Sequence, residues 1–132
     1  VIWMARNGKS KDEIKEYVIL EFGYDLSRTC DEIRPEYFHQ ESCQKTVPEA
    51  MTAFFEGKDL EDVIRTAVSL GGDCDTLTDI ATAMGEAFYG MNDDLRRAVM
   101  QYTTEDMHRV LMEFDNVKIK RVQDKGKVAV WA

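Results

Sequence analysis

Cysteine and long apolar runs are both scarce in this sequence. Its 132 residues include three cysteines and no Cys-x-x-Cys pair, which argues against a disulfide scaffold and against a zinc knuckle. No uninterrupted apolar run is longer than residues 1–5, far short of the roughly 18 residues that a membrane-spanning helix needs. These absences predict a soluble protein with no membrane partner, in a reducing, cytoplasmic setting.

Basic residues are also in the minority. Lys and Arg total 17 against 25 Asp and Glu, which gives a formal net charge of −8 at pH 7. A field of that sign repels phosphate backbones, so nucleic-acid binding is disfavoured. The charge is unevenly spread, because residues 117–132 carry five basic residues and one acidic residue. We expect this basic end to be a solvated tail.

The remaining composition is that of a globular domain, with 44% hydrophobic and 32% charged residues. Capping patterns and helical apolar periods predict helices over residues 11–22, 60–70 and 75–89, with shorter ones over 93–102 and 104–114. Residues 24–45 are polar and aperiodic, which predicts a long ordered loop with one short helical turn. Thr46 to Glu49 forms a second capping box, with Pro48 in the first turn of the next helix. Residues 117–131 alternate apolar and polar side chains, which predicts a hairpin or an extended tail.

The organisation expected is therefore an all-α body over residues 1–116, followed by a basic tail or hairpin over residues 117–132. We find no internal repeat and no low-complexity tract.

The residues best suited to metal binding or catalysis follow a pair of glycines. Gly71-Gly72 precedes Asp73, Asp75 and Thr76, at the start of the helix predicted over residues 75–89. Two carboxylates and a hydroxyl are hard oxygen donors, which suit Mg²⁺, Mn²⁺ or Ca²⁺ better than zinc. Asp79 lies one helical turn after Asp75 and is a candidate for supporting the site by hydrogen bonding.

A purely structural alternative remains open for these aspartates. Aspartate is a favoured residue at the start of a helix, where it caps free backbone amides and is stabilised by the helix dipole. An EF-hand is excluded, because it would need an oxygen ligand at Leu77 and glycine at Thr78. A phosphatase-type aspartate pair is excluded as well, since the preceding segment has the period of a helix and not of a strand.

The same segment resembles a known family. Residues 64–76, Ile-Arg-Thr-Ala-Val-Ser-Leu-Gly-Gly-Asp-Cys-Asp-Thr, with Ala-Phe-Tyr-Gly at 87–90, resemble the carboxyl-terminal signature of the ADP-ribosylglycohydrolases. Residues 34–50 resemble the segment that precedes this signature in bacterial members. The resemblance covers residues 5–114.

This resemblance implies an all-α fold of orthogonally packed helices, with two magnesium ions (or manganese) at the bottom of a cleft. Family members hydrolyse the N- or O-glycosidic bond that joins ADP-ribose to a protein or another acceptor. On the matching positions, Asp73, Asp75 and Thr76 would be metal ligands, and Gly72 would contact substrate. Ser42 is a further substrate-binding candidate, because it precedes a predicted helix start that suits an anion. The expected partners are an ADP-ribosylated protein or a small ADP-ribosyl compound.

The sequence departs from the family in one respect. Family members are about twice this long, and their amino-terminal half supplies the other metal ligands through a Thr-Asp-Asp motif. That motif is absent from these 132 residues. We therefore expect the chain to be the carboxyl-terminal half of such an enzyme, inactive without its other half or an oligomer partner. The alternative expectation is a non-catalytic helical module that binds a ligand or a partner on the same scaffold.

Overall fold

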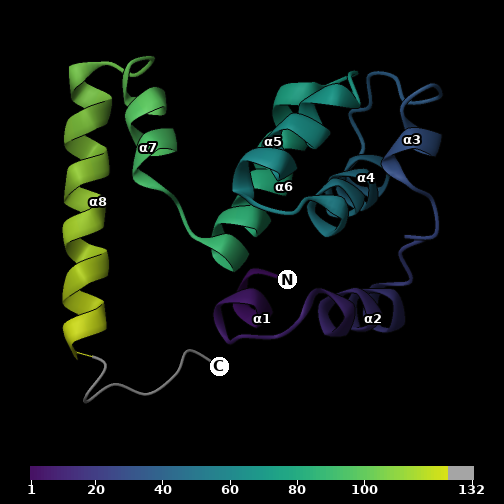
Figure 1. Cartoon of the computed structure of the whole chain (residues 1–132), viewed down its shortest axis with the longest axis horizontal. Helices are drawn as coiled ribbons and strands as arrows, with labels where there is room; N and C mark the ends of the chain where they lie inside the picture. The colour runs from purple at the N-terminus through teal and green to yellow at the C-terminus, as the bar shows by residue number, and fades with distance from the viewer. Residues whose placement is uncertain (125–132) are drawn as a thin grey trace. The chain divides into compact units, whose positions relative to one another are not determined.

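The computed structural model describes the backbone of residues 1–124 and the side chains of residues 1–117. Within that part of the chain the structure is all-α, as predicted, and contains no strand. The helices are α1 (Ile2–Arg6), α2 (Lys11–Phe22), α3 (Cys30–Ile33), α4 (Cys43–Glu56), α5 (Leu60–Ser69), α6 (Cys74–Tyr89), α7 (Asp93–Met100) and α8 (Glu105–Asp124) (Figure 1). No helix among the described residues is both long enough and apolar enough to cross a bilayer.

The chain forms two compact units, residues 1–91 and residues 92–132, which are described separately. In the first unit α6 lies against α5, α4 and α1 (Figure 1). Its inner face buries Leu77, Ala81 and Met84. Gly85 allows α5 to come close, because a Cβ atom there would lie 3.1 Å from Leu60 Cδ1. Helix α6 therefore packs on three other helices, and this packing holds its first turn, which carries the candidate ligands.

Local signals define several helix ends as predicted. Ser10 and Glu13 form the expected capping box at the start of α2, and Gly23 ends that helix with a left-handed φ of 67°. Asp59 caps α5 by accepting a hydrogen bond from the Asp62 amide at 2.8 Å. The long connection after α2 contains one short helix, α3, where a single helical turn was expected.

Lys11 joins α2 to the end of α4. Its Nζ donates hydrogen bonds to the carbonyl oxygens of Phe54 at 2.7 Å and Phe55 at 3.1 Å, and also to that of Gly57. The ammonium group also lies 5.0 Å from the centroids of the Phe54 and Tyr89 rings. The terminal carbonyls of α4, which no longer have partners within the helix, are thus satisfied by one side chain from α2.

The predicted start of α4 is wrong. The helix begins at Cys43 and not after Thr46, which is buried with 4% of its surface exposed. The Thr46 amide donates to the Ser42 carbonyl at 3.0 Å, so Thr46 is already inside the first turn. Pro48 consequently lies within the helix, where its carbonyl accepts a hydrogen bond from the Thr52 hydroxyl at 3.1 Å.

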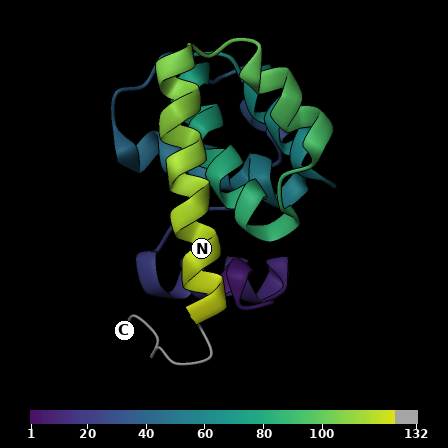
Figure 2. The same cartoon turned by 90° about the vertical axis from the view of Figure 1, so that its left-hand side faces the viewer.

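The second unit contains α7 and α8. None of the described side chains at positions 92–117 is buried. Helix α8 is one uninterrupted helix (Figures 1 and 2), and the predicted boundary at residues 116 and 117 falls inside it. Residues 117–124 are therefore helical, contrary to the predicted hairpin or extended tail. Lys, Arg and Gln favour a helix, and no Gly or Pro interrupts residues 105–124. The rest of the predicted tail, residues 125–132, lies outside the described residues.

Candidate functional site

Two successive glycines turn the chain between α5 and α6. Gly71 and Gly72 both have positive φ, 74° and 62°, a backbone conformation that other residues rarely adopt. Asp73 follows as the residue that precedes α6, and Asp75 and Thr76 lie in the first turn of the helix. The sharp turn brings the three predicted metal ligands together at one end of α6.

The connection between α3 and α4 lies directly against this turn. A Cβ atom on Gly72 would lie 2.8 Å from Tyr37 Cε1 and 2.9 Å from the backbone carbon of Phe38, so only glycine fits there. Burial raises the pKa of the Tyr37 hydroxyl, and the nearby negative charge of Asp73 acts in the same direction. The loop and the acidic segment are therefore one local structure, although more than thirty residues separate them in the sequence.

The side chains of Asp73 and Asp75 interact with each other. A hydrogen-bonding contact with the Asp73 side chain is the main reason why the pKa of Asp75 is lowered, and hydrogen bonds from backbone amides act in the same direction. A smaller contribution comes from the charge of His39. Asp75 Oδ1 also accepts a hydrogen bond from the Thr76 amide at 3.0 Å.

The capping alternative does not account for Asp73. Asp73 occupies the position before α6, yet its side chain makes no capping hydrogen bond. Neither Asp73 nor Asp75 forms an ion pair with a Lys or Arg side chain in the described part of the chain. The acidic segment therefore has no Lys or Arg counter-charge among the described residues.

The pair is an open surface site. Asp75, Thr76 and Asp79 are exposed, and Asp73 is half-buried. Among the described residues no group of three or more His, Cys, Asp or Glu side chains is placed to hold one metal ion. His39 lies close enough to influence Asp75, but its Nε2 is 3.5 Å from Glu41 Oε1. The described chain therefore offers two carboxylates and one hydroxyl, about half of the six or so ligands that Mg²⁺ takes.

Ser42 lies at the start of α4 and makes a local contact. Its hydroxyl donates a hydrogen bond to Gln44 Oε1 at 2.9 Å, and its side chain does not cap the helix. The structure brings Gly72, Asp73, Asp75 and Thr76 together, whereas no hydrogen bond among the described residues joins Ser42 to them.

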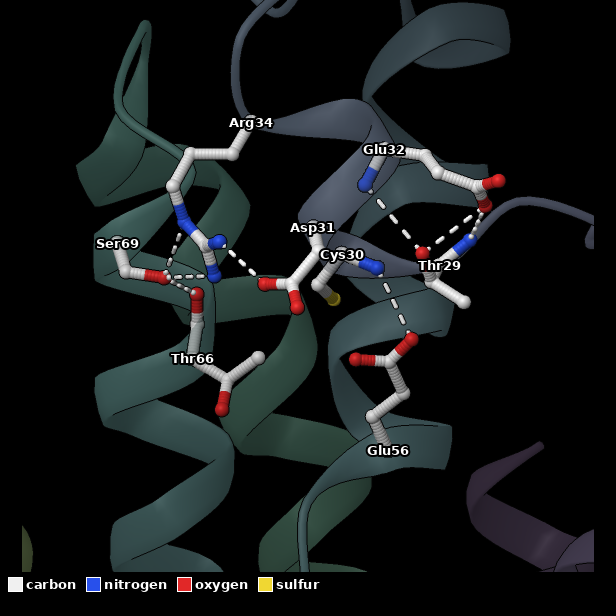
Figure 3. A network of polar contacts seen from close by, with 8 residues as sticks. All are labelled: Thr29, Cys30, Asp31, Glu32, Arg34, Glu56, Thr66 and Ser69. Carbon is white, nitrogen blue, oxygen red and sulfur yellow. Dashed lines mark hydrogen bonds and ion pairs between the residues drawn. The ribbon is translucent and has the colours of Figure 1, made fainter.

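An arginine network fixes the loop near the glycine turn (Figure 3). Arg34, just after α3, donates to Ser69 Oγ through Nε at 3.3 Å and through one terminal nitrogen at 3.0 Å. Its other terminal nitrogen donates to Asp31 Oδ1 at 2.5 Å. Ser69 is the last residue of α5, and its hydroxyl donates in turn to the Thr66 carbonyl at 2.7 Å. Arg34 thus connects the loop to the helix end that leads into Gly71.

The same network surrounds a buried thiol. The Cys30 amide donates to Glu56 Oε1 at 2.9 Å, as Figure 3 shows. Burial, with a smaller contribution from Glu56, raises the pKa of the Cys30 thiol to about 12. Cys43 is exposed and Cys74 is half-buried.

A cavity of about 380 Å³ lies beside the loop and was not predicted from the sequence. An ion pair between Arg28 and Glu49 lines it, together with residues of both flanking segments and of α4, namely Gly23, Tyr24, Asp25, Ile33, Glu36, Tyr37, Gln40, Gln44, Lys45 and Pro48. Burial raises the pKa of Glu49, an effect that the charge of Arg28 opposes. Arg28 and Glu49 are 21 positions apart and share no local sequence motif, so this cavity becomes apparent only in the folded structure. The acidic segment does not line it.

Comparison of the chain with protein-family models, with curated proteins and with solved structures gave no match.

Proposed function

We propose that the chain carries part of the metal site of a hydrolase that removes ADP-ribose from a protein or another acceptor. The proposal joins the resemblance of residues 64–90 to the ADP-ribosylglycohydrolase signature with the geometry of the acidic segment. The observation that carries it is that Asp73 occupies the position before α6, two residues from Asp75, and yet its side chain makes no capping hydrogen bond to the helix. We extend the proposal to the fold, with residues 1–91 packed in the manner of that family.

The donor set fits a hard divalent cation. Asp73, Asp75 and the Thr76 hydroxyl would hold it, and the Thr76 hydroxyl makes no hydrogen bond within the described structure. A bound magnesium ion would supply charge stabilisation and an activated water for hydrolysis. The ligands that this segment lacks would be water molecules or groups from another polypeptide segment.

The residues of the chain have separable roles in this proposal. The two carboxylates hold the cation, and the glycine turn sets their spacing. Arg34 is a positioning residue, because it ties the loop at Tyr37 to the end of α5 just before the turn. Gly72 is exposed and has no side chain, so substrate contact at this position would come from backbone atoms.

A direct test is the binding of Mn²⁺, followed by NMR line broadening of backbone amides in the folded chain. We expect selective broadening at residues 73–76 in the wild type and its loss in Asp75→Asn. The matched control is Asp79→Asn, an exposed aspartate one turn further along α6, which should keep the broadening. Broadening that is the same in the wild type and in Asp75→Asn, or that is absent at residues 73–76, contradicts the proposal.

A second candidate function is a non-catalytic interaction module. It is favoured by large apolar side chains exposed on the first unit, where Trp3, Leu20 and Phe38 are 61%, 75% and 68% exposed. Titration with ADP-ribose, first with magnesium and then with EDTA, separates the two candidates. Magnesium-dependent binding supports the hydrolase site, and binding that EDTA leaves unchanged supports the module.

A further inference from the structure

The Tyr37 hydroxyl is a buried polar group without a hydrogen-bond partner. Its oxygen is shielded from solvent and forms no hydrogen bond, a property that it shares with the hydroxyls of Thr78 and Thr82 among the described residues. Leaving a buried hydroxyl without a hydrogen bond costs about 1–3 kcal/mol. Such groups are rare in native structures, and they often mark a catalytic or ion-binding role.

The ring of Tyr37 lies against the turn that precedes α6. A Cβ atom on Gly72 would lie 2.8 Å from Tyr37 Cε1, the ring carbon next to the one that carries the hydroxyl. Asp73 directly follows Gly72 and is half-buried. The Tyr37 hydroxyl is therefore close to the first of the two carboxylates that we propose as metal ligands.

The charges around the hydroxyl agree with this position. Burial is the main cause of the raised pKa of Tyr37, and the charge of Asp73 adds more to it than the charge of Glu49 does. Glu49 already has a partner, because it forms an ion pair with Arg28. Thr46 is close enough to lower the pKa of Tyr37, but the two hydroxyls form no hydrogen bond. Asp73 is therefore the acceptor available to the Tyr37 hydroxyl.

We propose that Tyr37 is a positioning residue of the cation site, whose hydroxyl donates a hydrogen bond to the Asp73 carboxylate when a cation is bound. This bond would occupy one carboxylate oxygen and leave the other for the cation. Asp73 can turn toward the hydroxyl, because its side chain makes no capping hydrogen bond to α6. The inference rests on the proposed function, since it takes Asp73 as a metal ligand.

The tyrosine is well held for this role. Its amide donates a hydrogen bond to the Ile33 carbonyl at 2.9 Å, and its ring packs against the core of the first unit. The hydroxyl is thus in place before a cation binds, and ordering it costs nothing further on binding. Groups that hydrogen-bond to a metal ligand orient it, and their loss typically lowers metal affinity by about tenfold to a hundredfold.

The test is a titration of Tyr37→Phe and of the wild type with Mn²⁺, followed by NMR line broadening of the amides at residues 73–76. We expect the apparent dissociation constant of Tyr37→Phe to be about tenfold higher, because phenylalanine keeps the ring but lacks the donor. The matched control is Tyr24→Phe, which should keep the wild-type affinity. Tyr24 lines the same cavity as Tyr37, but its atoms are not among those nearest to Gly72.

Urea unfolding in EDTA gives a second readout, which separates this role from a purely structural one. Without a cation the hydroxyl has no partner, so Tyr37→Phe should unfold at the same urea concentration as the wild type or at a higher one. A lower midpoint overturns the proposal, because it would show that the hydroxyl already forms a bond in the metal-free chain.

The Mn²⁺ titration also separates failure of this inference from failure of the proposed function. A wild type that binds Mn²⁺ at residues 73–76, with equal affinity in Tyr37→Phe, overturns the role of Tyr37 alone. A wild type that shows no broadening at these residues overturns the proposed metal site, and the role of Tyr37 with it.

Discussion

Two independent constraints require glycine at position 72. Its positive φ strains any residue with a side chain, and a Cβ atom would collide with Tyr37 and the Phe38 backbone. Gly71 has the first constraint alone, because nothing lies within 4 Å of the corresponding Cβ position. The two neighbouring glycines therefore form a matched pair in which strain and collision can be separated.

We predict that Gly72→Ala destabilises the chain more than Gly71→Ala does. The strain of a non-glycine residue at positive φ costs about 1 kcal/mol or more in both variants. Only Gly72→Ala must also displace the loop, so urea unfolding should show the larger loss of stability for it. Chemical shifts at Tyr37 and Phe38 should move in Gly72→Ala and stay in place in Gly71→Ala. Equal losses in the two variants would show that the loop does not rest on Gly72.

At the scale of elements, one lysine side chain satisfies the free carbonyl groups at the end of α4. Lys11 donates to three carbonyl oxygens at the end of α4, those of Phe54, Phe55 and Gly57. Burial lowers the pKa of Lys11, and the charge of Asp62 opposes this effect. The contact couples two helices that are more than forty residues apart in the sequence.

Replacing Lys11 by methionine should destabilise the first unit by about 1–3 kcal/mol, because partly buried carbonyls lose their donor while the apolar stem is retained. The control is Lys15→Met on the same helix, where the ammonium group lies 6.0 Å from the Phe55 ring and makes no such hydrogen bonds. Urea unfolding followed by circular dichroism measures both. The interpretation fails if the two variants lose the same stability.

The accuracy of sequence-based prediction also differs between elements. The start of α2 was predictable because the capping box of Ser10 and Glu13 is complete within four residues. The same kind of pattern at Thr46 predicted the wrong start for α4, since Thr46 is buried and the turn before it is already helical. A capping pattern gives a local preference, and the packing of the residue decides whether it is used.

At the scale of the whole molecule, burial is concentrated in one unit. Side chains such as Leu77 and Phe54 are fully buried in residues 1–91, whereas the described part of residues 92–132 buries none. Local stability follows buried apolar contact, so the two units should open with different free energies.

Hydrogen–deuterium exchange should reveal that difference. We expect backbone amides in the middle of α6 to exchange about a hundredfold or more slowly than those of α7, which is short and has no buried residue. Equal protection of α6 and α7 would show that residues 92–132 share the stability of the first unit.

The sequence predicts the helical class and the grouping of Asp73, Asp75 and Thr76, because both depend on short-range patterns. It does not predict the loop at Tyr37 beside Gly72, or the ion pair between Arg28 and Glu49, since these join distant segments. It also misassigned residues 117–124, where alternating side chains favour a strand only if another strand is available to pair with.

The three thiols differ in burial, so the rates at which they are alkylated can report on unfolding. In the folded chain an alkylating reagent should reach exposed Cys43 first and half-buried Cys74 more slowly. Cys30, 1% exposed and with a pKa of about 12, should react only in molecules that have opened. Counting the modified cysteines against time would then report how often the first unit opens in water, with no denaturant present.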